Sequence, residues 1–180
     1  MKKLKVFEAF AGYGGASYGL KRSKIEFEVV GFSEIDKFAS EFYQKNHPKT
    51  YNYGDITKIE PNKIPDFDIF TGGFPCQPFS QVGMGLGEDD TRGTLFHDII
   101  RICKVKKPKH ILLENVKGLK TIKHGSTLKT IVSKLTKLGY DVVTEVMNSK
   151  NYGIPQNRER VWIYAYQGIL PLTFNLSPPT

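Results

Sequence analysis

A cysteine between turn-forming residues is the strongest chemical feature of this 180-residue sequence. Cys76 lies in Gly-Gly-Phe-Pro-Cys-Gln-Pro-Phe-Ser, residues 72–80. Two prolines around one Cys-Gln pair coincide by chance about once in 400 placements at the usual frequency of proline. A thiol held in such a turn is presented rather than packed, and nucleophilic chemistry requires its thiolate. The second cysteine, Cys103, falls in an apolar helical pattern and is expected to be a buried core residue.

A glycine-rich turn and two acidic residues form a second group of candidates. Three glycines follow the first apolar segment: Gly12, Gly14 and Gly15. Glycine there lets the backbone approach a ligand, and the next helix points its N–H groups at it. Because Ser17 replaces the third glycine of the dinucleotide fingerprint, a nicotinamide-dependent dehydrogenase is disfavoured. Glu34 lies where nucleotide-binding sheets hydrogen-bond a ribose, and Asp55, expected to close a further strand, can accept a purine amino group. Taken singly, each also fits an ordinary turn or a solvated surface acid; together they indicate an adenosine-like ligand.

These candidates lie at the ends of predicted strands. Apolar segments predict strands at residues 4–10, 27–32, 66–71, 110–113, 141–147 and 160–166, and helical spacing predicts helices at 16–21, 35–46, 94–103 and 127–138. The alternation predicts an α/β fold with an open, mostly parallel twisted sheet and helices on both faces. Ligands bind such sheets beyond the carboxyl ends of the strands, so we expect one functional edge.

Composition narrows the class of protein. Hydrophobic residues make up 39% and charged residues 24%, which is typical of a folded domain. The sequence lacks the roughly 20-residue apolar run of a membrane span, and its basic N-terminus is unlike a secretory signal. The cysteine content fits a reducing, cytoplasmic setting, and a net charge of +8 favours a polyanionic partner.

In their order and spacing, these motifs resemble those of the DNA cytosine-5 methyltransferase family over nearly the whole chain. Residues 10–15 resemble the motif that binds S-adenosylmethionine, 75–77 the nucleophile motif, 92–96 the motif that follows it, 114–116 the motif whose acid engages the target base, and 156–160 the Gln-x-Arg-x-Arg motif. The resemblance implies the Rossmann-like fold of class I S-adenosylmethionine-dependent methyltransferases. It also implies cofactor contacts from Phe10, Gly12, Gly14, Gly15, Glu34, Ile35, Asp55, Ile56, Pro75 and Leu95.

The resemblance also implies a reaction in which no metal takes part. The Cys76 thiolate adds to carbon 6 of a cytosine flipped out of double-stranded DNA, and Glu114 holds or donates a proton at ring nitrogen 3. Arg160 hydrogen-bonds the carbonyl oxygen of the base, and Arg158 organises the site. Methyl transfer leaves S-adenosylhomocysteine. Four further residues are implied to contact the base or DNA: Ser80, Gln81, Asn115 and Gln156. Residues 80–90 are expected to form a mobile lid over the flipped base.

One departure from the family concerns length. Family members continue past the Gln-x-Arg-x-Arg motif with a target-recognition region and a C-terminal helix, which this sequence lacks. Residues 1–180 are therefore expected to form only the catalytic and cofactor-binding domain. The chain could be one subunit whose partner supplies the rest, a fragment, or a protein with altered function, and in the first two cases the isolated chain is expected to bind cofactor weakly and methylate poorly. A tRNA cytosine-5 methyltransferase and a non-catalytic DNA-binding or scaffold subunit stay open as alternatives.

Overall fold

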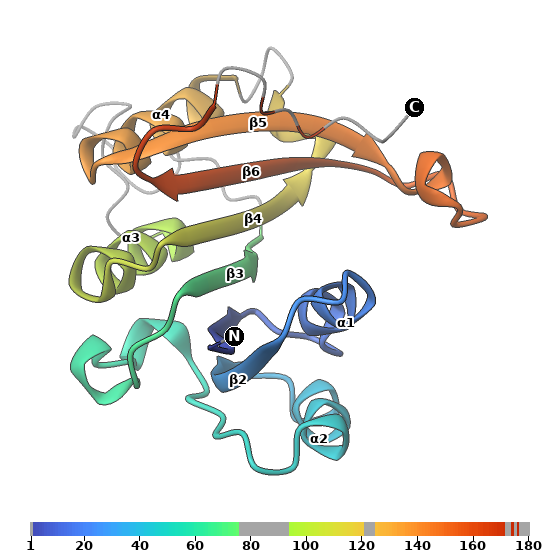
Figure 1. Cartoon of the computed structure of the whole chain (residues 1–180), viewed down its shortest axis with the longest axis vertical. Helices are drawn as coiled ribbons and strands as arrows, with labels where there is room; N and C mark the ends of the chain where they lie inside the picture. The colour runs from blue at the N-terminus through green and yellow to red at the C-terminus, as the bar shows by residue number, and fades with distance from the viewer. Residues whose placement is uncertain (1, 76–93, 121–124, 172–173, 175, 177–180) are drawn as a thin grey trace.

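Six strands form one mixed sheet in the order β2-β1-β3-β4-β6-β5 (Figure 1). The computed structural model describes residues 2–75, 94–120, 125–171, 174 and 176. The strands are β1 (Leu4–Ala9), β2 (Phe27–Ser33), β3 (Ile69–Gly73), β4 (His110–Val116), β5 (Tyr140–Asn148) and β6 (Glu159–Gln167). β1 pairs in parallel with β2 and β3, and β3 pairs in parallel with β4. β6 runs antiparallel to both β4 and β5, so its first residues lie beside the last residues of β4.

In the described part of the chain, four α-helices pack beside this sheet. They are α1 (Gly15–Arg22), α2 (Lys37–Asn46), α3 (Leu95–Lys106) and α4 (Gly125–Lys137). The chain moves from β1 to β2 in one direction and from β3 to β4 in the other, and crossovers between parallel strands are right-handed. The reversal therefore places α1 on one side of the sheet and α3 and α4 on the other (Figure 1). Ligands bind at such a switch point, here between β1 and β3.

Local signals in the sequence set the helix ends. The Asp36 carboxylate caps α2 by accepting a hydrogen bond from the Ala39 N–H at 2.7 Å, and the Thr94 hydroxyl accepts one from the His97 N–H at the start of α3. After α4, Gly139 adopts a φ of +91°, which a residue with a side chain rarely tolerates. This position agrees with the predicted end of the helix.

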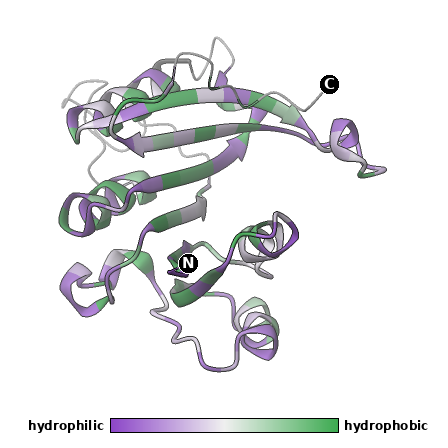
Figure 2. Ribbon diagram, in the orientation of Figure 1, coloured by the Kyte–Doolittle hydropathy of each residue, from purple (hydrophilic) through white to green (hydrophobic). Residues whose placement is uncertain are grey.

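The main core lies between the sheet and the α3–α4 pair. Alternate strand residues, such as Phe70, Ile111 and Ile163, meet Ile99 of α3 and Ile131 of α4, and all five are fully buried. Figure 2 shows hydrophobic stretches along β4 and β5, whereas the helices mix hydrophobic and hydrophilic residues. Since strand side chains alternate between faces, Leu112 and Glu114 of β4 point to the opposite side, toward α1.

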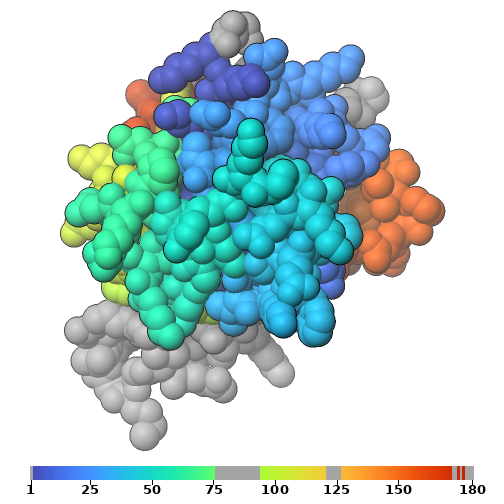
Figure 3. Space-filling model, turned by 90° about the horizontal axis from the view of Figure 1, so that it is seen from below, coloured from blue at the N-terminus to red at the C-terminus, as the bar shows by residue number. Residues whose placement is uncertain are grey.

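The predicted elements are largely confirmed, with differences at their ends. β3 begins three residues later than expected, at Ile69, and β4 continues to Val116. The further strand before Asp55 is wrong, because this segment forms a single bridge between Phe32 and Asn52 and then turns into the 3-10 helix η1 (Ile56–Lys58). A second 3-10 helix, η2 (Pro61–Lys63), follows, and Figure 3 shows this part of the chain on the surface of the molecule. Within the described ranges, no helix is long and apolar enough to cross a membrane.

Candidate functional site

A cavity of about 670 Å³ opens at the switch point, between α1 and the carboxyl ends of β1, β3 and β4. Its walls bring together Phe10 and Gly15 of the glycine-rich turn, Glu114 of β4, and Arg158 and Trp162 from the β6 side. Its size is typical of a small-molecule site. The cavity therefore joins Phe10 and Gly15, which are predicted to bind a cofactor, to Glu114 and Arg158, which are predicted to act on a base, whereas Glu34 and Asp55 do not line it.

The glycine-rich turn needs its glycines for conformation and for space. Gly12 and Gly14 have φ values of +53° and +87°, and Phe10 also lies in the left-handed region at +52°. A Cβ on Gly14 would lie 3.2 Å from the Tyr43 ring, which is tighter than an ordinary contact. The turn thus brings the backbone close to α2 and directs the start of α1 at the cavity.

Glu34 is fixed against this turn by backbone donors. Its Oε2 accepts a hydrogen bond from the Gly12 N–H at 2.8 Å, and its Oε1 accepts one from the Asp36 N–H at 2.8 Å. Each carboxylate oxygen has further lone pairs, so the pair can still accept hydrogen bonds from two vicinal hydroxyl groups. The neighbouring side chains of Ile35 and Phe38 are 79% and 75% exposed, and they offer an apolar surface beside the acid.

Asp55 and Ile56 lie at the start of η1, next to Glu34. The Asn52 carboxamide connects Glu34 to the segment that leads into Asp55, because its Oδ1 accepts hydrogen bonds from the N–H groups of Glu34 and Gly54. Asp55 Oδ1 accepts hydrogen bonds from the Thr57 N–H and hydroxyl, and these lower the pKa of the Asp55 carboxyl. Asp55 is therefore an ionised acceptor at the edge of the Glu34 region.

Glu114 lies beside two arginines. Its Oε1 is 2.9 Å from Arg160 Nε and 3.6 Å from an Arg158 terminal nitrogen. The contact follows from the antiparallel register, in which Glu114 is opposite Trp162 and Arg160 lies two residues earlier on the same face. The Glu114 side chain keeps 24% of its surface exposed, so the charged cluster is accessible from the cavity.

Asn115 fixes the end of β3 beside this cluster. Its buried side chain donates a hydrogen bond from Nδ2 to the Phe74 carbonyl oxygen at 2.9 Å. A Cβ on Gly73 would lie 3.3 Å from Glu114 Oε2, so the backbone passes directly beside the carboxylate. Pro75, the last described residue of this segment, is exposed. The chain is thus held next to Glu114 up to the residue that precedes Cys76.

Other predicted residues have less direct positions. Leu95 begins α3 and packs against the core, and Gln156 is exposed in the loop between η5 (Ser149–Tyr152) and β6. Arg158 is 49% exposed at the mouth of the cavity. Three predicted site residues lie outside the described residues, as does the predicted lid at 80–90: Cys76, Ser80 and Gln81.

Glu8 and Trp162 were not predicted as site residues, although the structure places both in the cavity wall. Glu8 is 1% exposed and accepts hydrogen bonds from the Ser17 N–H and the Tyr43 hydroxyl. An acidic residue inside the otherwise apolar run Val-Phe-Glu-Ala-Phe was the available signal. Trp162 carried no such signal, because nothing local shows that it lies opposite Glu114.

Comparisons with known proteins agree with this arrangement. The family model of the C-5 cytosine-specific DNA methylases matches residues 4–178. The type II methyltransferase M1.ScrFI of Lactococcus lactis subsp. cremoris is 51% identical over 91% of this chain and 42% of its own length. M.HaeII of Haemophilus aegyptius is 48% identical over 97% of this chain and 54% of its own. The chain thus spans about half the length of these relatives.

Solved structures show the same fold. A mutant of Spodoptera frugiperda DNMT2 superposes with a TM-score of 0.78 at 27% identity, covering 96% of this chain and 52% of that one. Schizosaccharomyces pombe Dnmt2 superposes with a TM-score of 0.75 at 26% identity, covering 94% and 51%. The predicted Rossmann-like fold is therefore confirmed, and the chain belongs to the C-5 cytosine-specific DNA methylase family.

Proposed function

We propose that this chain is the cofactor-binding and catalytic part of an enzyme that methylates carbon 5 of cytosine in double-stranded DNA. The observation that carries the proposal is the ion pair between Arg160 and Glu114 of the cavity wall, with the segment leading to Cys76 held beside it by Asn115. M1.ScrFI and M.HaeII are named type II methyltransferases, which supports a role in a restriction-modification system of a bacterial cytoplasm.

The residues that line the cavity, together with Glu34, Ile35 and Asp55 outside its wall, fit S-adenosylmethionine. Glu34 can accept the two ribose hydroxyls, Ile35 can pack on the adenine, and Asp55 can accept its amino group. The glycine-rich turn leaves room for the amino-acid end of the ligand near the start of α1. When bound, the cofactor supplies an electrophilic methyl group on a sulfonium.

The side chains around the base divide the remaining work. The Cys76 thiolate forms a bond to carbon 6, while Glu114 holds a proton at nitrogen 3 so that charge does not build up on the ring. Arg160 stabilises the carbonyl oxygen of the base, and Arg158 keeps Glu114 oriented. Carbon 5 takes the methyl group, and S-adenosylhomocysteine is left. Carbon 5 then loses its proton to water, and the electron pair of that C–H bond expels Cys76 as the thiolate and restores the aromatic ring.

The size of the relatives bears on target choice. Since the chain covers 42% of one relative and 54% of another, we propose that sequence recognition depends on polypeptide beyond these 180 residues, in the same protein or in a second subunit. The positive charge of the chain supports contact with the DNA backbone but carries no sequence information.

The covalent step can be tested by trapping. In DNA that contains 5-fluorocytosine, the last elimination is blocked because fluorine replaces the departing proton, so a protein–DNA adduct should persist in denaturing gels with S-adenosylmethionine present. Cys76→Ala should abolish both the adduct and methyl transfer. Cys103→Ala removes the other, fully buried thiol and should keep both. A protein–DNA adduct formed by the Cys76→Ala variant, or methyl transfer to tRNA in place of DNA, would refute the proposal.

A further inference from the structure

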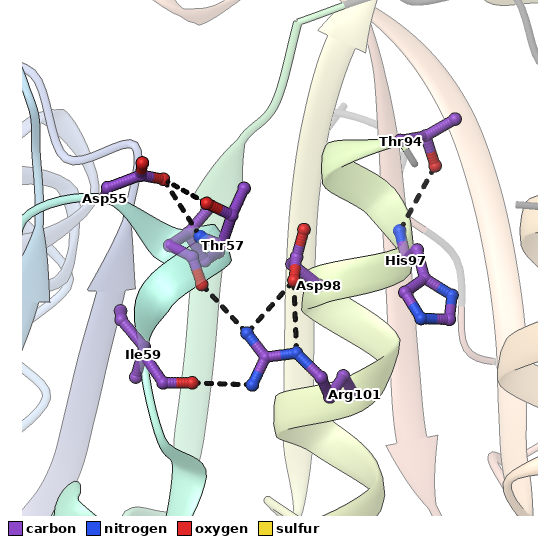
Figure 4. A network of polar contacts seen from close by, with 8 residues as sticks. Asp55, Thr57, Ile59, Thr94, His97, Asp98 and Arg101 are labelled. Carbon is purple, nitrogen blue, oxygen red and sulfur yellow. Dashed lines mark hydrogen bonds and ion pairs between the residues drawn. The ribbon is translucent and has the colours of Figure 1, made fainter. Parts of the chain in front are cut away.

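Arg101 of α3 binds the backbone at both ends of η1. Its terminal nitrogens donate hydrogen bonds to the Ile59 carbonyl oxygen at 2.6 Å and to the Ile56 carbonyl oxygen at 2.9 Å (Figure 4). The same guanidinium donates to Asp98 Oδ1 from Nε at 3.1 Å and from a terminal nitrogen at 3.0 Å. One side chain thus connects α3 to the segment that begins with Asp55.

This arrangement uses the fork geometry of arginine. A planar guanidinium presents several N–H donors in fixed directions, so it can serve two carbonyls and one carboxylate together, which a lysine ammonium cannot do in the same plane. Asp98, one helical turn before Arg101 and largely buried, orients the fork. The side chains of Ile56 and Ile59 are buried in the core and anchor the segment. The hydrogen bonds from Arg101 also fix the directions of their two carbonyl groups.

Asp55 is held from the other side as well. The Ser33 hydroxyl donates a hydrogen bond to the Gly54 carbonyl oxygen at 2.6 Å, and Asn52 accepts one from the Gly54 N–H. These contacts tie the residue before Asp55 to the end of β2, whereas Arg101 ties the residue after it to α3. Thr57 donates to Asp55 Oδ1, and the exposed Lys58 Nζ lies 3.7 Å from Oδ2. Because Thr57 and Lys58 are both residues of η1, the direction of the carboxylate depends on the backbone of η1.

We infer that Arg101, oriented by Asp98, is a positioning residue that fixes the Asp55 carboxylate for recognition of the amino group of the cofactor's adenine. This inference rests on the proposed function, because it takes Asp55 as the adenine acceptor. It assigns to α3 a part in selecting the cofactor, because the Arg101 guanidinium is directed at Asp98 and at the backbone of η1.

The test compares two ligands that differ at that amino group and at the adjoining ring nitrogen 1, which carries a proton in the inosyl ligand. S-adenosylhomocysteine offers a donor to Asp55, whereas S-inosylhomocysteine presents a carbonyl oxygen that the carboxylate repels. Calorimetry with the wild-type protein should show at least about tenfold tighter binding of the adenosyl ligand. Arg101→Met should reduce this preference to about twofold, and Arg101→Lys and Asp98→Asn should give intermediate ratios.

A matched control lies on the same helix. Lys106→Met removes another cation of α3, whose ion pair with Asp66 does not involve η1, and it should leave the ratio unchanged. In the ligand-free protein, hydrogen exchange at the amides of Lys58 and Ile59 should be faster in Arg101→Met than in Lys106→Met. If Arg101→Met does not fold, the Asp98→Asn ratio decides.

The binding ratios distinguish a failure of the role of Arg101 from a failure of the proposed function. An unchanged ratio in Arg101→Met or Asp98→Asn, with the wild-type preference present, overturns the role of Arg101 and leaves the proposed function standing. Equal weakening of both ligands also overturns it, because a merely structural residue would act that way. A wild-type protein that does not distinguish the ligands overturns the assignment of Asp55 and this inference with it.

Discussion

Two carboxylates line the same cavity in opposite surroundings. Glu8 of β1 is 1% exposed and receives its hydrogen bonds from neutral donors, the Ser17 N–H and the Tyr43 hydroxyl. Glu114 of β4 is 24% exposed and is placed beside two guanidinium groups. In the part of the chain that the structure describes, Glu8 forms no ion pair, so the start of α1 and a phenol stabilise its charge in place of a cation.

The difference indicates different work for the two acids. Glu8 fixes α1 and α2 to β1: it accepts from the third residue of α1, and Tyr43 of α2 closes over it. Burial and the neighbouring Glu8 raise the pKa of Tyr43 far above its usual range, so the phenol stays a donor. Glu114 keeps an open side toward the cavity, where a substrate can reach it. One acid is committed to the fold and the other is available for chemistry.

The largest expected effect comes from neutralising the accessible acid. Glu114→Gln should lower the rate of methyl transfer about 1,000-fold, because an amide cannot exchange the proton that assists addition to the base. The affinity for S-adenosylhomocysteine should change little, since Glu114 belongs to the base side of the cavity. Single-turnover transfer with labelled cofactor and calorimetry measure the two quantities. A loss of cofactor affinity as large as the loss of rate would show that Glu114 supports the fold or the cofactor site and does not act on the base.

The sequence predicts the positions of the cofactor-binding residues better than those of the residues around the base. The glycine-rich turn and Glu34 follow β1 and β2, which pair in parallel, so their meeting at one edge follows from the alternation of strands and helices. Asp55 follows only the single parallel bridge between Phe32 and Asn52. The contact between Glu114 and Arg160 requires β6 to run antiparallel in a given register, and no local pattern encodes that register. Family resemblance supplied this pair.

Glu8 and Arg101 show why the remainder could not be predicted. Both are charged residues whose partners lie on elements distant in sequence, Tyr43 for Glu8 and the carbonyls of η1 for Arg101. Their burial depends on the packing of helices against strands. Because every residue has a backbone carbonyl, the amino-acid sequence does not show which carbonyl accepts a hydrogen bond from Arg101. Helical spacing therefore showed where α2 and α3 form but not which polar groups they cover.

The two arginines at Glu114 can be ranked by geometry. Arg160→Met should reduce methyl transfer about 100-fold, because its Nε donates at 2.9 Å and the group is three-quarters covered. Arg158→Met should reduce it only about tenfold, since its nitrogen is 3.6 Å from the carboxylate and half of the side chain is exposed to solvent. Steady-state rates at saturating DNA check the order. Equal losses would show that the two guanidiniums act as one unit.

The hydrogen bonds of Glu8, the acid that holds the fold, should contribute to the free energy of unfolding. Tyr43→Phe removes a hydrogen bond to a buried carboxylate and should lower the free energy of unfolding by about 2 kcal/mol, measured by urea denaturation near pH 7. Tyr51→Phe makes the same chemical change on an exposed ring and should stay within about 0.5 kcal/mol of wild type. Similar values for both variants would mean that Glu8 is satisfied without the phenol.

The smallest effect concerns alkaline pH and isolates Tyr43 from the other tyrosines. The folded-state pKa of Tyr43 is raised by burial and by Glu8, whereas in the unfolded chain the phenol ionises near its ordinary value of about 10. The folded state then binds more protons than the unfolded state above pH 10, so this group's contribution to stability falls as the pH rises. The difference between wild type and Tyr43→Phe should accordingly shrink by up to about 1.4 kcal/mol for each pH unit above 10. Titrations common to both proteins cancel in this difference. A gap that stays constant between pH 9 and 11 would show that Tyr43 ionises alike in both states, and Glu8 would then be no more enclosed than Glu114.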